Sequence, residues 1–390
     1  MFANRTHWPS KTNKIISRLE DLKKERKKII DLTESNPTVC GFHYPQEILS
    51  PLGDPKNIIY EPCPLGLLES REAVGRYYQE KGYSVSPQRI ALTSSTSEGY
   101  AFILRLLCNE KENVLVPKPS YPLFDLLAQL NDVELKTYTL PGPSWRIDPD
   151  DIEKAINRKT RAIILVNPNN PTGSFVGDQD LKKINEICKK YNLAIISDEV
   201  FLDYAFDDQD VKATSCVHNS EVLTFTLSGV SKILGLPQMK ISWIVTSGPD
   251  SQVKESQRRL EIILDTYLSV NTPSQRALIS WMPLRRDIQK EICDRLRKNH
   301  DYLRKALSGQ NACDLLDAQG GWYALLRLPQ KRKEEEWVLE FLEHDLVFVH
   351  PGYFFDFEQE PVIVLSLLPA PELFQEGLDR LVRKIKQPIS

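Results

Sequence analysis

The sequence predicts an α/β protein, with a three-layer αβα domain built on a mostly parallel sheet and a smaller α+β domain. Between residues 90 and 245, short apolar runs alternate with helical stretches. The runs are continuous and rich in β-branched residues, as expected of strands that helices cover on both faces. After residue 250 the pattern changes to long helical stretches followed by short strands. This change predicts a second, smaller α+β domain beside the main sheet.

The expected elements follow one another along the chain. Residues 12–30 are predicted to form an amphipathic helix, and residues 31–38 a short strand that runs into a loop. The strands of the main sheet are expected at 90–93, 113–116, 162–166, 193–196, 222–226 and 241–245, with helices at 98–107 and 180–190. In the smaller domain we expect helices at 251–269, 286–306 and 371–385, and strands at 322–328, 347–350 and 362–367. The large domain is placed at 46–280, and the small one at 1–45 plus 281–390.

Composition excludes several classes of protein. Apolar residues make up 41% of the 390 residues, charged residues 26%, and the net charge is −3, so no overall basic surface for nucleic acid is expected. No run approaches the 18 apolar residues of a membrane span, and the first residues lack the apolar core of a signal peptide. The seven cysteines and six histidines show no metal-ligand spacing, so we expect a reduced, cytoplasmic protein without a metal site.

Five polar segments stand out, most of them where an expected strand ends, which is the edge at which an α/β sheet binds its ligand. The first is the run Thr93–Gly99, whose hydroxyls fit both helix capping and an anion site for a phosphate. In the second, Tyr121 lies between Pro119 and Pro122, either as a packed turn or as a ring that stacks on a flat ligand.

The other three segments supply an amide, a carboxylate and an amine. The loop 167–173 is rich in asparagine, which the sharp turn alone does not explain. Asp198 and Glu199 directly follow a buried strand, either as a helix cap or as a carboxylate paired with a cation. Lys232 lies in a Gly/Ser turn, where a lysine taken alone is ordinarily solvated. Together the five segments hold the parts that pyridoxal 5′-phosphate (PLP) demands.

The order and spacing of these segments resemble the class I/II aminotransferases of PLP fold type I. The matching motifs are Asn170-Pro171-Thr172-Gly173, Asp198-Glu199-Val200 and Ser231-Lys232. Tyr60 with Gly66, and the segment 69–74, also look like the part of the family that precedes the large domain. The resemblance extends from about residue 35 to the closing helix, and it implies the fold, PLP as cofactor and a homodimer with shared active sites.

The resemblance also implies roles for the residues around the cofactor ring. Lys232 is expected to hold PLP as a Schiff base and then to move the substrate Cα proton. Asp198 is expected to pair with the protonated pyridine nitrogen, and Asn170 to donate to the ring 3-oxygen. Tyr121 is expected to stack on the face of the ring.

Further roles follow for the phosphate and the substrate. The expected phosphate side of the site consists of Ser95, Thr96, Ser97, Ser231 and Lys240. Tyr60 is expected to reach the phosphate of the neighbouring subunit. Asn36 and Asn170 are expected to contact the substrate.

Three positions near the cofactor depart from the family pattern. Lys240 stands where the family has its phosphate-binding arginine, which keeps the charge but loses the bidentate fork. Phe201 replaces a frequent tyrosine and so removes a second donor to the 3-oxygen, for which Tyr204 is a candidate substitute. Gly229 replaces a serine, with Ser228 displaced by one position.

The largest departure concerns the substrate. Val364 stands where the family has the arginine that clamps the substrate α-carboxylate. Either another cation has taken over, with Arg327 and Arg146 as candidates, or the substrate has no carboxylate there. We expect the first explanation, with the carboxylate bound by a non-standard group.

Three functions compete on this evidence. The first is transamination, in which an amino group moves from an amino acid or amine to a 2-oxo acid. The second is a PLP lyase of the carbon–sulfur β-lyase type, because Cα deprotonation is common to both reactions. The third is a non-catalytic PLP-binding scaffold, which the intact Lys232, Asp198 and Asn170 disfavour. We expect small-molecule substrates and neither a nucleic-acid nor a membrane partner.

Overall fold

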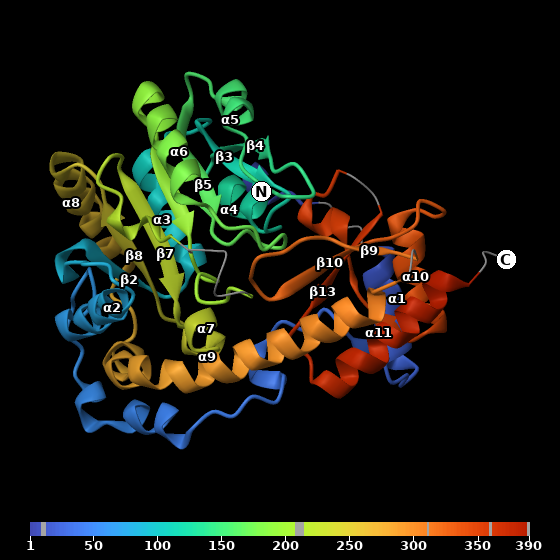
Figure 1. The fold of residues 1–390 in the computed structure, drawn as a ribbon. Helices are drawn as coiled ribbons and strands as arrows, with labels where there is room; N and C mark the ends of the chain where they lie inside the picture. Colours follow the sequence, from blue (N-terminus) through green and yellow to red (C-terminus); the bar gives the residue numbers. More distant parts are fainter. Residues whose placement is uncertain (9–12, 207–213, 310–311, 359–360, 388–390) are drawn as a thin grey trace.

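The computed structural model describes residues 1–8, 13–206, 214–309, 312–358 and 361–387, and it is built around a seven-stranded sheet (Figure 1). The strand order is β2 (Ile90–Thr93), β8 (Ser242–Ser247), β7 (Thr224–Gly229), β6 (Ala194–Asp198), β5 (Thr160–Val166), β3 (Asn113–Lys118) and β4 (Glu134–Thr139). Only β8 runs antiparallel to its neighbours in this sheet. The predicted, mostly parallel sheet is therefore confirmed.

Helices cover both faces of this sheet. Side chains of α3 (Thr96–Leu107), α4 (Phe124–Leu130) and α8 (Asp250–Tyr267) share one apolar cluster with one set of strand residues. Side chains of α5 (Pro149–Ala155) and α6 (Asp178–Tyr191) pack with the alternate strand residues, and α2 (Leu68–Glu80) packs on the β8 side of that same face. Because successive side chains of a strand point to opposite faces, this division is that of a three-layer αβα structure.

A smaller α+β part lies beside the main sheet (Figure 1). Its antiparallel sheet has the order β12 (His350–Pro351), β13 (Val362–Ser366), β10 (Tyr323–Arg327) and β9 (Asp314–Leu315). A separate parallel pair joins β1 (Ile30–Asp31) to β11 (Val347–Phe348). The helices of this part are α1 (Lys14–Lys24), α10 (Glu334–His344), α11 (Pro371–Lys386) and the long α9 (Thr272–Leu307), which reaches both parts.

Some boundaries differ from the sequence prediction. The first helix ends at Lys24, because Arg26 adopts a left-handed conformation (φ 59°) and the Lys27 N–H donates to the Leu22 carbonyl at 3.0 Å. Residue 12, the predicted start of that helix, lies outside the described residues. The expected strand 347–350 is divided between β11 and β12, which belong to different sheets. Strand β4 was not predicted, because in this edge strand only Tyr138 is buried.

The start of α9 was also predicted wrongly. The sequence prediction began this helix at residue 286, whereas it starts at Thr272 and contains Pro283. The side chain of Asn271 caps the true start by accepting from the Ser274 N–H at 2.9 Å. The predicted domain boundary after residue 280 falls inside this continuous helix, so the division into 46–280 and 1–45 plus 281–390 stays a prediction.

All seven cysteines carry free thiols. Within the described ranges, the helices are all too short or too polar to cross a membrane.

Candidate active site

The polar segments singled out in the sequence meet at one edge of the main sheet. Strands β3, β5, β6 and β7 run parallel, and their carboxyl ends lie at the same edge. Asp198 ends β6, and Lys232 lies on the short helix α7 (Val230–Ile233) directly after β7. Tyr121 follows β3, Asn170 follows β5, and Ser95 caps the helix after β2. The fold therefore assembles these five positions as predicted.

The amine of Lys232 is half-buried among aromatic rings. Its Nζ lies 4.6 Å from the ring centroid of Trp322 and 5.2 Å from that of Phe201. Burial lowers the pKa of this amine to about 8, and the nearby Asp198 carboxylate opposes the shift. In the described part of the chain Lys232 has no ion pair within 4.0 Å. A substantial neutral fraction of the amine is thus present near neutral pH.

The carboxylate of Asp198 is buried beside this amine. Its Oδ2 accepts a hydrogen bond from the Tyr100 hydroxyl at 3.0 Å, and its Oδ1 accepts from the Val200 N–H at 3.2 Å. Burial raises the pKa of Asp198 to about 6, while the two hydrogen bonds and Lys232 oppose the rise. At neutral pH the site therefore holds a carboxylate that lacks a strong cation partner.

Tyr100 is a site residue that the sequence reasoning missed. It lies on α3, four residues after Thr96, and is 3% exposed. The spacing of one helical turn places it on the face of α3 that covers the sheet. That spacing from the predicted phosphate segment was the available signal.

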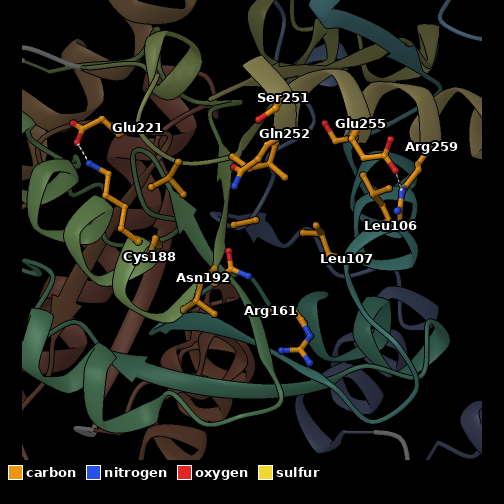
Figure 2. Close-up of a pocket in the computed structure, with 16 residues that line it drawn as sticks. Leu106, Leu107, Arg161, Cys188, Asn192, Glu221, Ser251, Gln252, Glu255 and Arg259 are labelled. Atoms are coloured by element: carbon orange, nitrogen blue, oxygen red, sulfur yellow. Dashed lines mark hydrogen bonds and ion pairs between the residues drawn. The ribbon is translucent and has the colours of Figure 1, made fainter. Parts of the chain in front are cut away.

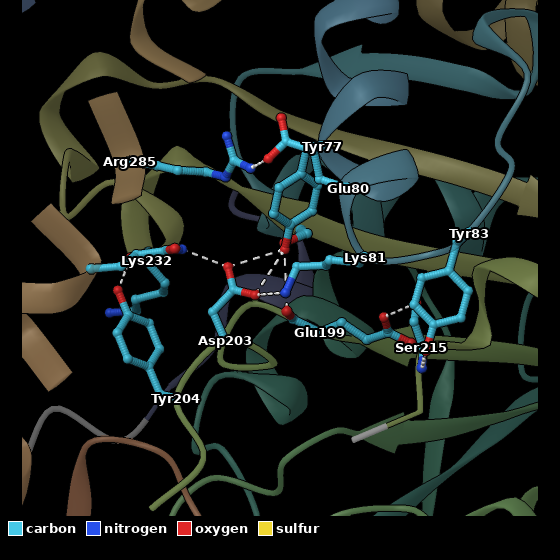
Figure 3. A network of polar contacts seen from close by, with 12 residues as sticks. Tyr77, Glu80, Lys81, Tyr83, Glu199, Asp203, Tyr204, Ser215, Lys232 and Arg285 are labelled. Carbon is cyan, nitrogen blue, oxygen red and sulfur yellow. Dashed lines mark hydrogen bonds and ion pairs between the residues drawn. The ribbon is translucent and has the colours of Figure 1, made fainter. Parts of the chain in front are cut away.

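Glu199 has a structural role that differs from that of its neighbour. It accepts a hydrogen bond from the Ser215 hydroxyl at 2.5 Å (Figure 3). It also accepts from the Ser197 hydroxyl at 2.9 Å and from the Cys216 N–H at 2.7 Å. Burial raises the pKa of Glu199 to about 7 despite these donors. Glu199 therefore ties the segment at 215–216 to the end of β6.

Tyr204 holds the lysine rather than facing a ligand. Its hydroxyl donates to the backbone carbonyl of Lys232 at 2.5 Å (Figure 3). This hydrogen bond occupies the hydroxyl that was a candidate second donor to the ring 3-oxygen. Phe201 is buried edge-on against Trp322, with 5.3 Å between ring centroids.

The loop after β5 is held by close backbone contacts. Gly173 has φ +73°, and a Cβ there would lie 2.3 Å from the Gly320 carbonyl oxygen. The Gln319 N–H donates to the Gly173 carbonyl at 3.2 Å, and the Gly321 N–H donates to the Tyr204 carbonyl at 2.7 Å. These contacts fix the chain just before Trp322 and so place its ring against Lys232. The glycine pair before Trp322 is the sequence feature that could have indicated this approach.

An aromatic ring and an amide come from the segments that follow the neighbouring strands β3 and β5. Asn170 is 7% exposed, and its buried Oδ1 has no hydrogen-bond partner among the described residues. Burial, followed by the charge of Asp198, raises the pKa of Tyr121 to about 12, which reflects a position close to Asp198. The ring of Tyr121 is held edge-on by Phe124, with 5.9 Å between centroids.

The first turn of α3 offers N–H groups to an anion. The Ser95 hydroxyl accepts from the Glu98 N–H at 3.1 Å and so caps the helix. Thr96 and Ser97 are the first two helical residues, whose N–H groups have no acceptor within a helix. The capping interpretation of this segment is therefore confirmed, and the capping leaves the first N–H groups of α3 available, so the anion site stays a prediction.

The other predicted site residues are more exposed to solvent than Lys232 and Asp198, or lie only half-buried at the site edge. Lys240 is exposed, in a left-handed conformation, two residues before Ser242, which pairs with Thr93 at the site edge. Ser231 is half-buried next to Lys232. The Asn36 side chain is exposed and caps its own turn, accepting from the Thr38 N–H at 3.1 Å. Tyr60 is 57% exposed.

A model of the aminotransferase class I and II family matches residues 53–381. This chain belongs to that family. The glutamate–pyruvate aminotransferase of Escherichia coli is 26% identical over 378 residues, covering 95% of this chain and 93% of that protein. The alanine aminotransferase of Pyrococcus furiosus has a similar structure (TM-score 0.86, 25% identity), covering 95% of this chain and 96% of that one. An S-alkyl-thiohydroximate lyase of Arabidopsis thaliana is 29% identical over 248 residues, covering 60% of this chain and 54% of that protein.

Enzymes of this aminotransferase family use PLP, and the residues present fit that cofactor. The buried Asn170 amide has an unpartnered oxygen, and the amide offers both donors and an acceptor to a ring substituent. Asp198 is a buried carboxylate suited to a protonated ring nitrogen, and Lys232 is an amine with a lowered pKa. The expected cofactor and fold type are confirmed on these grounds.

In this aminotransferase the position of the family arginine is filled by packed apolar structure. Val364 is 1% exposed and pairs with Leu325 and His350 on neighbouring strands. Arg327 lies two positions after Leu325 on β10, so it projects from the same face as Leu325 and pairs with Val362. Arg146 is exposed. Neither arginine has a recorded ion pair among the described residues.

A cavity of this aminotransferase lies away from the site (Figure 2). Its walls come from the amino ends of β5, β6 and β7, at the opposite edge of the sheet from Lys232. Its charged side chains are paired with one another or with neighbours: Arg259 with Glu255 at 2.6 Å, Lys189 with Glu221 at 2.5 Å, and Arg161 with Glu112. These lining cations are thus already neutralised.

Proposed function

We propose that this aminotransferase binds PLP through the residues around Lys232 and moves an amino group from an amino acid or amine to a 2-oxo acid. The observation that carries the proposal is that two groups with shifted pKa values lie near each other at the carboxyl ends of the neighbouring strands β6 and β7. Lys232 has a pKa lowered to about 8, and Asp198 has a pKa raised to about 6, within electrostatic reach of each other.

The proposed chemistry divides between the cofactor and the chain. PLP, when bound, supplies an aldehyde that bonds an amine and a cationic ring that accepts the electron pair of the Cα–H bond. Asp198 keeps the ring nitrogen protonated, and Tyr100 holds that carboxylate in place. Lys232 in its neutral form accepts the substrate Cα proton and returns it. Tyr204 fixes the backbone from which Lys232 projects.

The other predicted residues would hold the phosphate and the ring of PLP. We assign the phosphate to the N–H groups of Thr96 and Ser97, with Ser95, Ser231 and Lys240 beside it. Asn170 donates to the ring 3-oxygen, and Tyr121 covers one face of the ring. Support comes from the free N–H groups of α3 and from the Asn170 amide, whose Nδ2 makes no recorded hydrogen bond to the described residues and whose Oδ1 is buried without a partner.

We also propose a homodimer in which Tyr60 reaches the phosphate of the neighbouring subunit. The exposed residues around it support this, because Ile58, Ile59 and Leu268 are 87%, 61% and 69% exposed and are apolar. Cys63 and Ser269 exchange hydrogen bonds of 2.8 and 2.9 Å, which place the two exposed segments side by side. Light scattering on the purified protein tests the dimer, and a monomer at micromolar concentration with full activity would rule it out.

For the substrate we propose a 2-amino acid donor and a 2-oxo acid acceptor, as the names of the two aminotransferase relatives suggest. Because Val364 is apolar and packed, another group must bind the donor carboxylate, and Asn36 and Asn170 are proposed contacts. A panel of amino donors on the purified enzyme tests this assignment. Turnover of carboxylate-free amines alone would show that no carboxylate site exists.

The same assay separates transamination from the lyase alternative. A lyase releases ammonia without a 2-oxo acid acceptor, whereas a transaminase stops after one turnover until an acceptor is added. We expect full dependence on the acceptor. For the compartment we propose the cytoplasm, which the seven free thiols support.

A further inference from the structure

The start of strand β8 brings a serine hydroxyl to the edge of the sheet that carries the site. Ser242 is the first residue of β8, and it pairs with Gly229 on one side and with Thr93 on the other. From Gly229 the chain continues directly to Lys232, and from Thr93 it continues to the start of α3. Ser242 therefore lies between the proposed amine and the proposed phosphate segment.

The side chain of Ser242 leans over Gly229. A Cβ added at Gly229 would lie 2.2 Å from the Ser242 Oγ and 2.8 Å from its Cβ. Such distances are far below van der Waals contact, so the hydroxyl fills the space that a side chain at 229 needs. The Ser242 hydroxyl therefore reaches, from the adjacent strand, the space that a serine side chain at position 229 would occupy.

This hydroxyl lies on the face of the sheet that α3 covers. Residues two apart on a strand share a face, so Gly229 and Ser242 share it with Leu227 and Ile244. A Cβ at Gly99 of α3 would lie 2.7 Å from Leu227 and 3.5 Å from Ile244. Because α3 begins at the site edge and runs away from it, its first turn lies over the Gly229–Ser242 pair.

The hydroxyl is also without a partner. Ser242 is 3% exposed, and its Oγ makes no recorded hydrogen bond to the described residues. Among the described residues, the Ser242 Oγ does not belong to the fully buried polar atoms that lack a partner, so it keeps some accessible surface and can donate to a ligand. The neighbouring N–H groups of Thr96 and Ser97 are likewise free for an acceptor.

We infer that Ser242 donates its hydroxyl to the cofactor phosphate, together with the first turn of α3. The inference rests on the proposed PLP function and adds a cofactor-binding residue from β8. The space between positions 229 and 242 has room for one side chain, which is that of Ser242, and position 229 is therefore a glycine.

Cofactor titration of the apoprotein tests the inference, with PLP and with pyridoxal, which lacks the phosphate. We expect Ser242→Ala to weaken PLP binding about tenfold, because it removes a hydrogen bond to a charged group. Pyridoxal binding and the melting temperature of the apoprotein are expected to stay unchanged. The control is Ser228→Ala, on the opposite face of the sheet one residue before Gly229, for which no change in the affinity for PLP is expected.

A swap of the two positions provides a second, independent readout. Gly229→Ser alone is expected to weaken PLP binding and to lower stability, because the new side chain meets Ser242. Adding Ser242→Gly is expected to restore both, since the hydroxyl returns to the same space from β7.

Two results would overturn the inference while leaving the PLP function intact: an unchanged ratio of PLP to pyridoxal affinity in Ser242→Ala, or no rescue by the double variant. Failure of the wild-type protein to bind PLP at all would instead contradict the proposed function.

Discussion

At the scale of single residues, Lys232 has the most distinctive environment in the site. Two aromatic rings lie within 5.2 Å of its amine, and burial among them lowers its pKa to about 8. Only the neutral amine attacks an aldehyde, so the rate of PLP attachment to the apoprotein is expected to rise between pH 7 and 9. Stopped-flow absorbance at several pH values measures this. A rate that keeps rising tenfold per pH unit up to pH 10 would show an unperturbed lysine.

Tyr100 is expected to tune its partner Asp198. Its hydrogen bond stabilises the ionised carboxylate and so holds the pKa of Asp198 below the value that burial alone would set. In Tyr100→Phe this pKa rises, and the pH below which PLP binding weakens is expected to move upward from about 6. Titration of PLP affinity against pH measures the shift. An equal loss of affinity at every pH would indicate a purely structural role.

The residues that carry local motifs were predictable from the sequence, whereas those that act across the fold were not. Lys232, Asp198 and Asn170 each belong to a short motif, and the structure brings them together. Trp322 reaches Lys232 from a segment 90 positions later in the chain, through contacts of the glycine pair before it. Ser242 meets Gly229 only because β8 pairs with β7. Pairing of this kind has no signature in a single sequence.

At the scale of elements, the loop after β5 and the segment before β10 depend on their glycines. Gly173→Ala places a Cβ 2.3 Å from the Gly320 carbonyl and strains a positive φ, so a loss of about 3 kcal/mol in the free energy of unfolding is expected. Gly82→Ala is the matched control, because its φ is +86° but no atom lies within 4 Å of the added Cβ. It is expected to cost about 1 kcal/mol. Urea denaturation compares the two, and equal losses would exclude the backbone clash.

The sequence predicted the strands that are buried on both faces of the sheet. It did not predict the edge strand or the true start of the long helix. The strands between β2 and β8 that are covered on both faces have continuous apolar runs and were found within a few residues. The edge strand β4 lacks such a run, since Tyr138 is its one buried residue. The helix α9 continues through Pro283, because its apolar face packs against α2 and α11 along its length. Tertiary packing therefore outweighs the local cost of the proline.

At the scale of the whole molecule, two buried acids link apoprotein stability to pH. Glu199 has a folded pKa of about 7, above its unfolded value of 4.5, so the folded state keeps a proton that the unfolded state has lost between these pH values. Stability is therefore expected to fall as pH rises from about 4.5 to 7, by on the order of 3 kcal/mol from this group. Asp198 adds a change of the same sign below pH 6.

Glu199→Gln isolates the larger of these two contributions. Glutamine cannot ionise, so the dependence of the unfolding free energy on pH between 4.5 and 7 is expected to flatten. Denaturation curves of both apoproteins at several pH values give the comparison. An equally steep dependence in the variant would place the titrating group elsewhere.

The central claim is that Lys232 is the amine that bonds PLP at the carboxyl edge of the main sheet. Borohydride reduction of the purified, PLP-loaded protein, followed by peptide mass spectrometry, tests it most directly. We expect one phosphopyridoxyl group per chain, on the peptide that contains Lys232, and none in Lys232→Ala. A modification on another lysine, or none at all in the wild-type protein, would contradict the claim.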